Sequence, residues 1–389
     1  DVCAIVGAKA QRRVQIAGAA EHNVVVTSYD LMRRDIDEYV EQDFARVVLD
    51  EAQYIKNPLT QVARAAKRLP AGARFALTGT PIENRLSELW SIFDFLMPGL
   101  LGTRESFAKR FESPVEHAEG DSAARLQALV SPFVLRRVKE DVVADLPEKI
   151  EDTVMAQLTG EQRKLYLANQ DRIAQQVQHR EASEFKKDKL KVLAELTKLR
   201  QICCDPRLHY EDYKAGSAKL DTCMELVHGA LDGGHRILLF SQFTGMLDII
   251  GKRLAKEDIA FLKLTGASSK ESRAKMVAQF QAGEVPVFLI SLKAGGVGLN
   301  LTAADVVIHY DPWWNVAAQD QATDRAHRIG QQHTVTVYKL IAKDTIEERI
   351  MQMQESKRDL VNSVLGGDGI SSALFTREDV LALLGGDGR

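Results

Sequence analysis

Two adjacent carboxylates stand where a buried strand is expected to end. Asp50 closes the apolar run Val47–Asp50, and Glu51 follows it directly. Parallel α/β sheets bind their ligands at the carboxyl ends of strands. Phosphoryl transfer from ATP needs a carboxylate for Mg²⁺ and a group that orients the attacking water. The pair is therefore a candidate ATP-hydrolysing site, although acidic residues are also common at helix starts for structural reasons.

Two hydroxyl side chains follow the next expected strand. Thr78 and Thr80 lie in a turn of small residues after the run Arg74–Leu77. A hydroxyl-bearing turn at a strand end suits a loop that couples hydrolysis to movement. A plain turn is the alternative interpretation.

A third group of residues lies in the second half of the chain. The glycine-rich stretch Ser291–Leu301 lets the backbone approach a phosphate closely. Further along, Gln321, Arg325 and Arg328 recur at spacings of four and three, which predicts one shared helix face. Two arginines so placed suit the stabilisation of phosphate charge, the role of an arginine finger. A surface helix with salt bridges is the alternative.

The elements that must position these residues alternate between strands and helices. Short apolar runs separated by helical patterns predict parallel sheets with right-handed crossovers, so the fold class is α/β. The expected strands are Val2–Val6, Val24–Thr27, Val47–Asp50, Arg74–Leu77, Ile237–Phe240, Phe261–Lys263, Val285–Ile290, Val306–Tyr310 and Thr334–Leu340.

The strand signal fades between residues 102 and 216. An amphipathic helix is expected at Glu184–Arg200, because Leu190, Leu193, Leu196 and Leu199 share one face. A short helix is expected at Phe375–Leu384, capped by Thr376. The expected domains are 1–101, 102–216, 217–365 and 366–389.

Bulk composition restricts the class of protein only weakly. The 389 residues carry 51 basic and 54 acidic side chains, so nucleic-acid binding would need local patches. The four cysteines are Cys3, Cys203, Cys204 and Cys223, and none forms a C-x-x-C pair, which favours reduced thiols in an intracellular protein. No apolar run reaches the roughly 18 residues of a membrane span, so no membrane partner is expected.

Together these segments resemble the SWI/SNF family of helicase superfamily two. The motifs that carry the resemblance are DEAQ at 50–53, LTGTPIENRLSELWSIFDFLMPGLLG at 77–102, ILLFSQF at 237–243, SLKAGGVGLNLTAAD at 291–305, DPWWN at 311–315 and QATDRAHRIGQ at 321–331. The last three together are specific to this family among helicase-like motors. One departure is Val316, where the family usually has proline after WWN; it affects only local backbone rigidity.

The resemblance implies two RecA-like lobes, the first truncated at its N-terminus, with helical protrusions between them. It implies ATP and Mg²⁺ as cofactors and double-stranded DNA as partner. The implied roles are Asp50 for Mg²⁺, Glu51 for the attacking water, Arg325 and Arg328 as arginine fingers, Gln53, Gly298 and Gln321 at the nucleotide, Thr78 and Thr80 in coupling, and Arg85, Lys293, Asn300 and Trp313 along the DNA, with Gly298 beside them.

Three functions stay open at this point. The first is a translocase that moves along duplex DNA without strand separation and remodels an unidentified DNA-bound protein complex. The second is a related motor directed at a transcription complex or RNA. The third is a non-catalytic DNA-binding module. The expected location is the cytoplasm or nucleoid in a bacterium, or the nucleus in a eukaryote.

The printed chain is expected not to hydrolyse ATP. It has no G-x-x-x-x-G-K-[ST] loop, whose amides and lysine would hold the phosphates, and the nearest pair, Gly251–Lys252, falls within a predicted helix. We read this as truncation, and we expect the first lobe to be poorly stable alone. Measurable steady-state phosphate release by the purified 389-residue chain would contradict the prediction.

Overall fold

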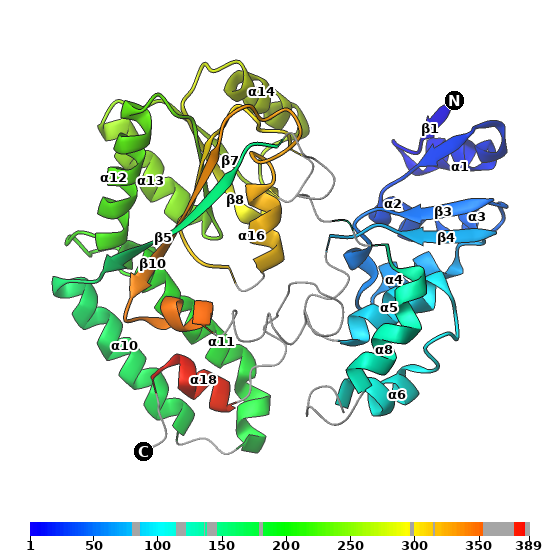
Figure 1. The fold of residues 1–389 in the computed structure, drawn as a ribbon, viewed down its shortest axis with the longest axis horizontal. Coiled ribbons are helices and arrows are strands. Elements are labelled where there is room, and N and C mark those ends of the chain that lie inside the picture. The colour runs from blue at the N-terminus through cyan, green and yellow to red at the C-terminus, as the bar shows by residue number, and fades with distance from the viewer. Residues whose placement is uncertain are drawn as a thin grey trace. The chain divides into compact units, whose positions relative to one another are not determined.

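The computed structural model describes residues 1–79, 86–113, 122–135, 137, 146–178, 182–295, 299–313, 316–352 and 377–385. The chain divides into two compact units, the first built by residues 1–135 and the second by most residues from 136 onward (Figure 1). The domain limits expected from the sequence stay predictions.

The first unit contains the four strands that were expected. They are β1 (Val2–Ala4), β2 (Val24–Val26), β3 (Arg46–Leu49) and β4 (Ala73–Ala76). β1 pairs with β2 and β3 pairs with β4, and both pairs are parallel. In the described part of the unit β2 and β3 are not paired, so the four strands form two separate two-stranded sheets. A cavity of about 350 Å³ separates their edges.

The helices of the first unit pack in two groups. One core joins the strands to α1 (Lys9–Ala17), α2 (Tyr29–Arg34), α3 (Ile36–Tyr39) and α4 (Gln61–Arg68). The other core joins α5 (Leu86–Leu96), α6 (Arg104–Phe107) and α8 (Ser122–Val130). The bidentate ion pair of Arg12 with Asp35, at 2.5 and 2.8 Å, is buried between α1 and the start of α3.

The second unit is built on a six-stranded parallel sheet. Its strands are β5 (Lys149–Gln157), β6 (Ile237–Ser241), β7 (Phe261–Leu264), β8 (Val287–Ser291), β9 (Val306–His309) and β10 (Val335–Lys343). Their order is β5-β10-β9-β6-β8-β7. The five strands expected in this half of the chain are confirmed, as are the parallel pairing and the α/β fold class.

Strand β5 corrects the sequence analysis, in which the strand signal fades between 102 and 216 and no strand is expected there. β5 is an edge strand, and most of its side chains are exposed. It therefore lacks the apolar run by which a buried strand is recognised. Glu151 of β5 accepts bonds from Lys149 at 2.7 Å and Lys339 of β10 at 2.6 Å. Burial alone would raise the pKa of Glu151, but these two lysines lower it to about 2.

Helices cover both faces of this sheet (Figure 1). α12 (Ala218–Asp232) and α13 (Thr244–Lys256) pack on the face that presents Leu239 and Ile308. α14 (Lys270–Gln281), α15 (Leu292–Gly295) and α16 (Val316–Thr323) pack on the face that presents Leu238 and Val307. Both faces of β6, β8 and β9 are therefore buried, which explains their continuous apolar runs.

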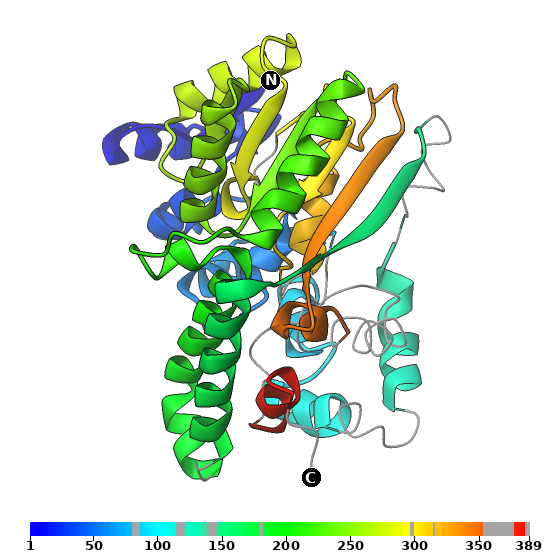
Figure 2. The same ribbon diagram turned by 90° about the vertical axis from the view of Figure 1, so that its left-hand side faces the viewer.

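A helical hairpin extends from the sheet, formed by α10 (Gly160–Gln178) and α11 (Ala182–Cys204) (Figure 2). Leu196 and Leu199 of α11 are fully buried, so the expected amphipathic helix is confirmed and extends to Cys204. The expected C-terminal helix is α18 (Arg377–Leu383), which packs on the same core. Its proposed cap, Thr376, lies outside the described residues.

Five shorter helices complete the described elements: η1 (Ala19–Glu21), η2 (Ala52–Ile55), the π-helical η3 (Ala108–Glu112), η4 (Ser131–Phe133) and η5 (Pro206–Leu208). Within the described ranges, no helix is both long and apolar enough to cross a membrane.

A buried ion pair ties α12 to the segment after β10. Lys219 Nζ lies 2.5 Å from Glu347 Oε2, and both side chains are fully buried. The Ala342 amide also donates to Glu347 Oε2, at 2.9 Å. Burial alone would lower the pKa of Lys219, but Glu347 raises it, so the lysine is charged.

We therefore expect Glu347→Gln to lower the free energy of unfolding by about 3–5 kcal/mol, because Lys219 would stay buried without its counter-charge. The control is Glu195→Gln, which breaks the half-exposed pair with Arg172 and should change stability by less than about 1 kcal/mol. Denaturant titration of the chain, following the unfolding of the second unit, measures the change in stability of both variants. Equal losses in the two variants would contradict the prediction.

Candidate active site

The adjacent carboxylates project from the carboxyl edge of β3, as the sequence predicted. Leu49 is buried, Asp50 is exposed and Glu51 is half-buried. The Ala52 amide donates to the Leu77 carbonyl oxygen at 2.8 Å, which joins the loop after β3 to the loop after β4. The two strand-end loops therefore form one connected surface.

Glu51 has an unusual backbone conformation. Its φ and ψ are 51° and 53°, in the left-handed region that favours glycine. A non-glycine residue pays a steric penalty there, and such residues cluster at functional sites. The conformation lets the chain turn sharply from β3 into η2 while the carboxylate of Glu51 is retained at the turn.

A chain of hydrogen bonds runs from this carboxylate to the loop after β4. Gln53 Nε2 donates to Glu51 Oε2 at 2.7 Å, and Thr78 Oγ1 donates to Gln53 Oε1 at 2.8 Å. The nitrogen of the Gln53 side-chain amide thus bonds Glu51 in the loop after β3, and its oxygen accepts from Thr78 in the loop after β4. A shift of the Glu51 carboxylate would be transmitted to Thr78 through one side chain.

Tyr29 also belongs to this site, and the sequence analysis missed it. Its hydroxyl donates to the Asp50 carbonyl oxygen at 2.8 Å, and its ring stacks on Tyr54 with centroids 5.1 Å apart. Burial, and then the charges of Asp50 and Glu51, raise the pKa of Tyr29. The available signal was its place two residues after the expected strand Val24–Thr27, at the carboxyl end of a third strand.

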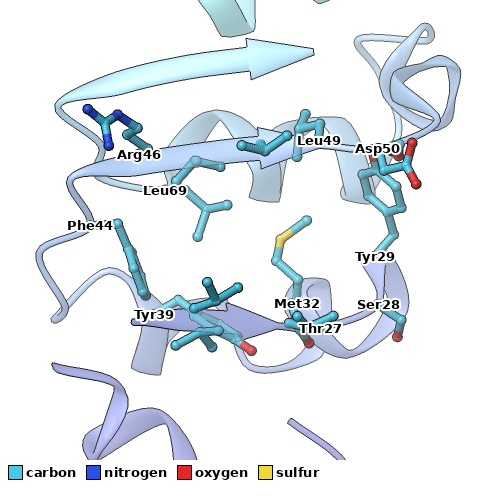
Figure 3. Close-up of a pocket in the computed structure, with 15 residues that line it drawn as sticks. Thr27, Ser28, Tyr29, Met32, Tyr39, Phe44, Arg46, Leu49, Asp50 and Leu69 are labelled. Carbon is cyan, nitrogen blue, oxygen red and sulfur yellow. Dashed lines mark hydrogen bonds between the residues drawn. The ribbon is translucent and has the colours of Figure 1, made fainter. Parts of the chain in front are cut away.

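The cavity between β2 and β3 reaches this site at one end only. Figure 3 shows Asp50 and Tyr29 beside each other at that end and Arg46 at the opposite end. Most of the lining between them is apolar, including Met32, Phe44 and Leu69 (Figure 3). The cavity is therefore a mainly apolar space within the layer of strands, and it meets the polar site where Asp50 and Tyr29 line its end.

The residues present fit a magnesium site of the kind that also uses substrate phosphates. Mg²⁺ keeps several waters and commonly binds one or two carboxylates together with phosphate oxygens. Asp50 offers one exposed carboxylate. The described residues contain no group of three or more potential metal ligands, so they offer no closed all-protein cage.

In the second unit, the arginine-bearing segment differs from its predicted form. Gln321 lies in α16, but this helix ends at Thr323, so Arg325 and Arg328 follow in a turn. The expectation of one continuous helix face for all three residues is wrong. The turn closes locally, because the Arg325 amide donates to the Ala322 carbonyl oxygen at 3.2 Å.

Two sets of hydrogen bonds hold this turn against the last residue of the glycine-rich stretch and the segment that follows it. The Leu301 amide donates to the Arg325 carbonyl oxygen at 3.0 Å. Gln331 Nε2 donates to three carbonyl oxygens, those of Thr302, Ala304 and Ala326, at 2.7–3.1 Å. The turn is therefore fixed from two directions, and Arg328 at its surface is exposed.

His309 supports α16 from beneath. It is buried at the end of β9, stacks on Phe240 at 5.5 Å, and its Nε2 lies 2.8 Å from Thr323 Oγ1. Burial, with a smaller effect of Lys339, lowers the pKa of His309 to about 3. The imidazole is therefore neutral at physiological pH and holds the last residue of α16 by a neutral hydrogen bond.

The residues expected along DNA are only partly described. Asn300 is exposed, and Trp313 is half-buried against the apolar core. Lys293 lies in α15, but its side chain is not described. Thr80, Arg85 and Gly298 lie outside the described residues.

The left-handed conformation of Glu51 gives a direct test. Both Glu51→Gly and Glu51→Ala remove the bond from Gln53, but only glycine adopts this φ without strain. We expect the glycine variant to unfold with a free energy about 1 kcal/mol higher than the alanine variant. Chemical denaturation followed by Trp90 emission, in a background with Trp313→Phe and Trp314→Phe, measures the difference. Equal stability of the alanine and glycine variants would show that the residue is unstrained.

Comparison with protein families gives two adjacent matches that cover most of the chain. Residues 1–208 match the SNF2-related domain, and residues 218–330 match the helicase conserved C-terminal domain. In solved structures, the SWI2/SNF2 ATPase core domain of Sulfolobus solfataricus is 35% identical, with a TM-score of 0.51 over 98% of this chain and 78% of that one. The same core in complex with dsDNA has a TM-score of 0.49, covering 94% and 81% of the two chains.

The chain is also similar to curated proteins of bacteria and eukaryotes. It is 41% identical over 92% of its length to a putative ATP-dependent helicase/translocase, YwqA of Bacillus subtilis, covering 39% of that protein. It is 40% identical over 93% of its length to an uncharacterized ATP-dependent helicase of Mycoplasma pneumoniae, covering 34%. It is 36% identical over 93% to human TATA-binding protein-associated factor 172, covering 23%.

The chain therefore spans between about a quarter and two fifths of these relatives. The family match, the structural similarity and the parallel α/β fold agree with the motifs described above. The chain belongs to the SNF2-related, or SWI/SNF, family of helicase superfamily two.

Proposed function

We propose that this chain forms motor segments of an ATP-driven translocase that moves along duplex DNA and remodels a DNA-bound protein complex. The observation that carries the proposal is the hydrogen-bonded chain from Glu51 through Gln53 to Thr78. It connects a carboxylate suited to orienting water with a second loop suited to movement. Relatives named as ATP-dependent helicases support the use of ATP.

In this proposal the first unit supplies the carboxylates. Asp50 would hold Mg²⁺ through its exposed oxygens, and bound Mg²⁺ would neutralise phosphate charge. Glu51 would orient the attacking water, because its carboxylate is half-buried and already positioned by Gln53. Release of phosphate would change the charge beside Glu51, and Gln53 would transmit that change to Thr78.

The second unit would supply the arginines and the grip on DNA. Arg325 and Arg328 would stabilise phosphate charge, with Gln321 beside them, from a turn fixed by Gln331. Asn300 and Trp313, together with Lys293 and Arg85, would contact the duplex along its backbone. Backbone contacts carry little sequence information, which suits a motor that must pass over any sequence.

The protein target is proposed only as a class. Several relatives are named TATA-binding protein-associated factors, which favours a protein held on DNA as the object of remodelling. A transcription complex is therefore the second candidate. With either target, we expect the protein to act inside the cell, in the compartment that contains DNA.

The test uses two forms of the protein. The printed chain is titrated with labelled duplex DNA, single-stranded DNA and RNA, and a form extended at its N-terminus to include a phosphate-binding loop is assayed for phosphate release with each. We expect duplex DNA to bind most tightly, with an affinity that falls steeply with salt, and to stimulate release most. Glu51→Gln should abolish release and leave duplex binding unchanged.

The other outcomes discriminate between the alternatives. Stronger stimulation by RNA or single strands would contradict the choice of duplex DNA. Duplex binding without any phosphate release would contradict the motor and favour a non-catalytic DNA-binding module.

A further inference from the structure

A buried arginine outside the motifs quoted above joins the helical hairpin to the loops of the second unit. Arg200 lies near the end of α11, and 2% of its surface is exposed. It is the largest of the fully buried side chains in the described part of the chain. Burying a guanidinium is unfavourable unless hydrogen bonds replace its hydration, so the groups that it contacts are informative.

Its first contact is with the loop after β9. Arg200 Nη2 donates to the carbonyl oxygen of Pro312. The amide of the next residue, Trp313, donates to Gln319 Oε1 of α16 in a long bond of 3.4 Å. These two groups belong to one peptide unit, which is planar and rotates as a rigid body. The peptide between Pro312 and Trp313 is therefore held on both sides, from α11 and from α16.

Its second contact is with the loop after β6. Arg200 Nη1 donates to Gln242 Oε1 at 3.2 Å, and the guanidinium lies over the ring of Phe243 at 5.8 Å. The backbone amide of Gln242 donates to the buried carboxylate of Asp311 at 3.3 Å, and Ser241 Oγ donates to the same carboxylate at 2.5 Å. One guanidinium thus bonds two loops that are already joined through Asp311.

The clamped peptide lies between residues of different expected roles. On one side the chain continues into Trp313, expected along DNA. On the other, Gln319 belongs to the same short helix as Gln321, which leads into the arginine-bearing turn. The direction of the Trp313 side chain depends on the orientation of the peptide before it. Through this peptide, Arg200 is thus placed to link the helical hairpin both to Trp313 and to α16.

From these contacts we propose that Arg200 is a positioning residue. It sets the peptide between Pro312 and Trp313, and through it the orientation of Trp313 and of α16, so that the α10–α11 hairpin is mechanically coupled to the DNA-facing loop. The part of the proposal that concerns DNA rests on the proposed function.

Arginine suits this place better than lysine. Its planar fork presents donors in fixed directions, so Nη1 and Nη2 can bond two loops at once while the flat face lies over Phe243. A lysine would place one ammonium in the same space and could not hold this arrangement. Arg200→Lys should therefore fail to restore the positioning even though it restores the charge.

The experiment compares Arg200→Met and Arg200→Lys with the matched control Arg172→Met, all in a Trp90→Phe background of the printed chain. Arg172 lies on the same hairpin and pairs with Glu195, away from the loops. With Trp90 replaced, emission comes from Trp313 and Trp314 alone, since the sequence has three tryptophans. The measurements are hydrogen exchange at the Trp313 amide, acrylamide quenching and affinity for a labelled 30-base-pair duplex.

We expect both Arg200 variants to exchange the Trp313 amide roughly 10–100-fold faster, as loss of a hydrogen bond from a charged donor predicts. Quenching should increase, and duplex affinity should fall by about tenfold on the same ground. The control should match the parent in all three. A second variant, Gln319→Met, removes the bond on the other side of the peptide and keeps the buried cation. It should also speed exchange at Trp313, and it carries the test if Arg200→Met does not fold.

Parent-like exchange and quenching in folded Arg200→Met and in Gln319→Met would overturn the proposal. So would full rescue by Arg200→Lys. If the parent itself does not bind the duplex, the proposed function fails, whereas exchange and quenching still decide the positioning role. If the loop responds but duplex affinity does not, Arg200 sets the loop and the coupling to DNA is rejected.

Discussion

Parallel pairing at the centre of the second unit is the constraint on which its loops depend. β6 is paired on one side with β8 and on the other with β9, so that Phe240 is level with both Ile290 and His309. The loops after these strands therefore leave the sheet at one edge and one height. All three strands are buried on both faces, so an apolar pattern alone would tolerate a slip by one residue. The buried hydrogen bonds from Ser241 and Gln242 to Asp311 fix the register of β6 against β9, because a slip by one residue would break them.

Polar bonds between strand-end loops also occur in the first unit, in smaller number. There, a backbone bond from Ala52 to Leu77 fixes the heights of two strand-end loops, and Gln53 adds a side-chain connection between them. In both units a polar side chain joins loops that are distant in sequence but neighbours in the sheet. A change of charge at one loop can therefore be felt at another without movement of the strands themselves.

The sequence allowed much of the fold to be predicted, because nine of the ten strands in the described residues were recognisable as short, mainly apolar runs. β5 was missed because an edge strand needs no apolar face on its exposed side. The site was predicted to the extent that its residues are close in sequence, as are Asp50, Glu51 and Gln53. Tyr29, His309, Gln331 and Arg200 act through partners that only the fold brings near. Arg200 and Pro312, for example, are 112 positions apart. The helical face predicted for Arg325 and Arg328 failed because α16 ends at Thr323, where His309 holds it.

Several charged side chains are buried in the described part of the second unit, and their location bears on how the unit works. Arg200, Lys219, Asp311 and Glu347 all lie where the helical hairpin and α12 meet the sheet. Apolar packing at that junction would be at least as stable, since buried ions rarely add net stability over well-packed hydrophobic groups. Apolar surfaces, however, can slide over one another with little penalty, whereas a buried charge separated from its partner is strongly unfavourable. A junction built from such groups has few alternative arrangements, so a displacement of the hairpin must be passed on to the loops at the edge of the sheet.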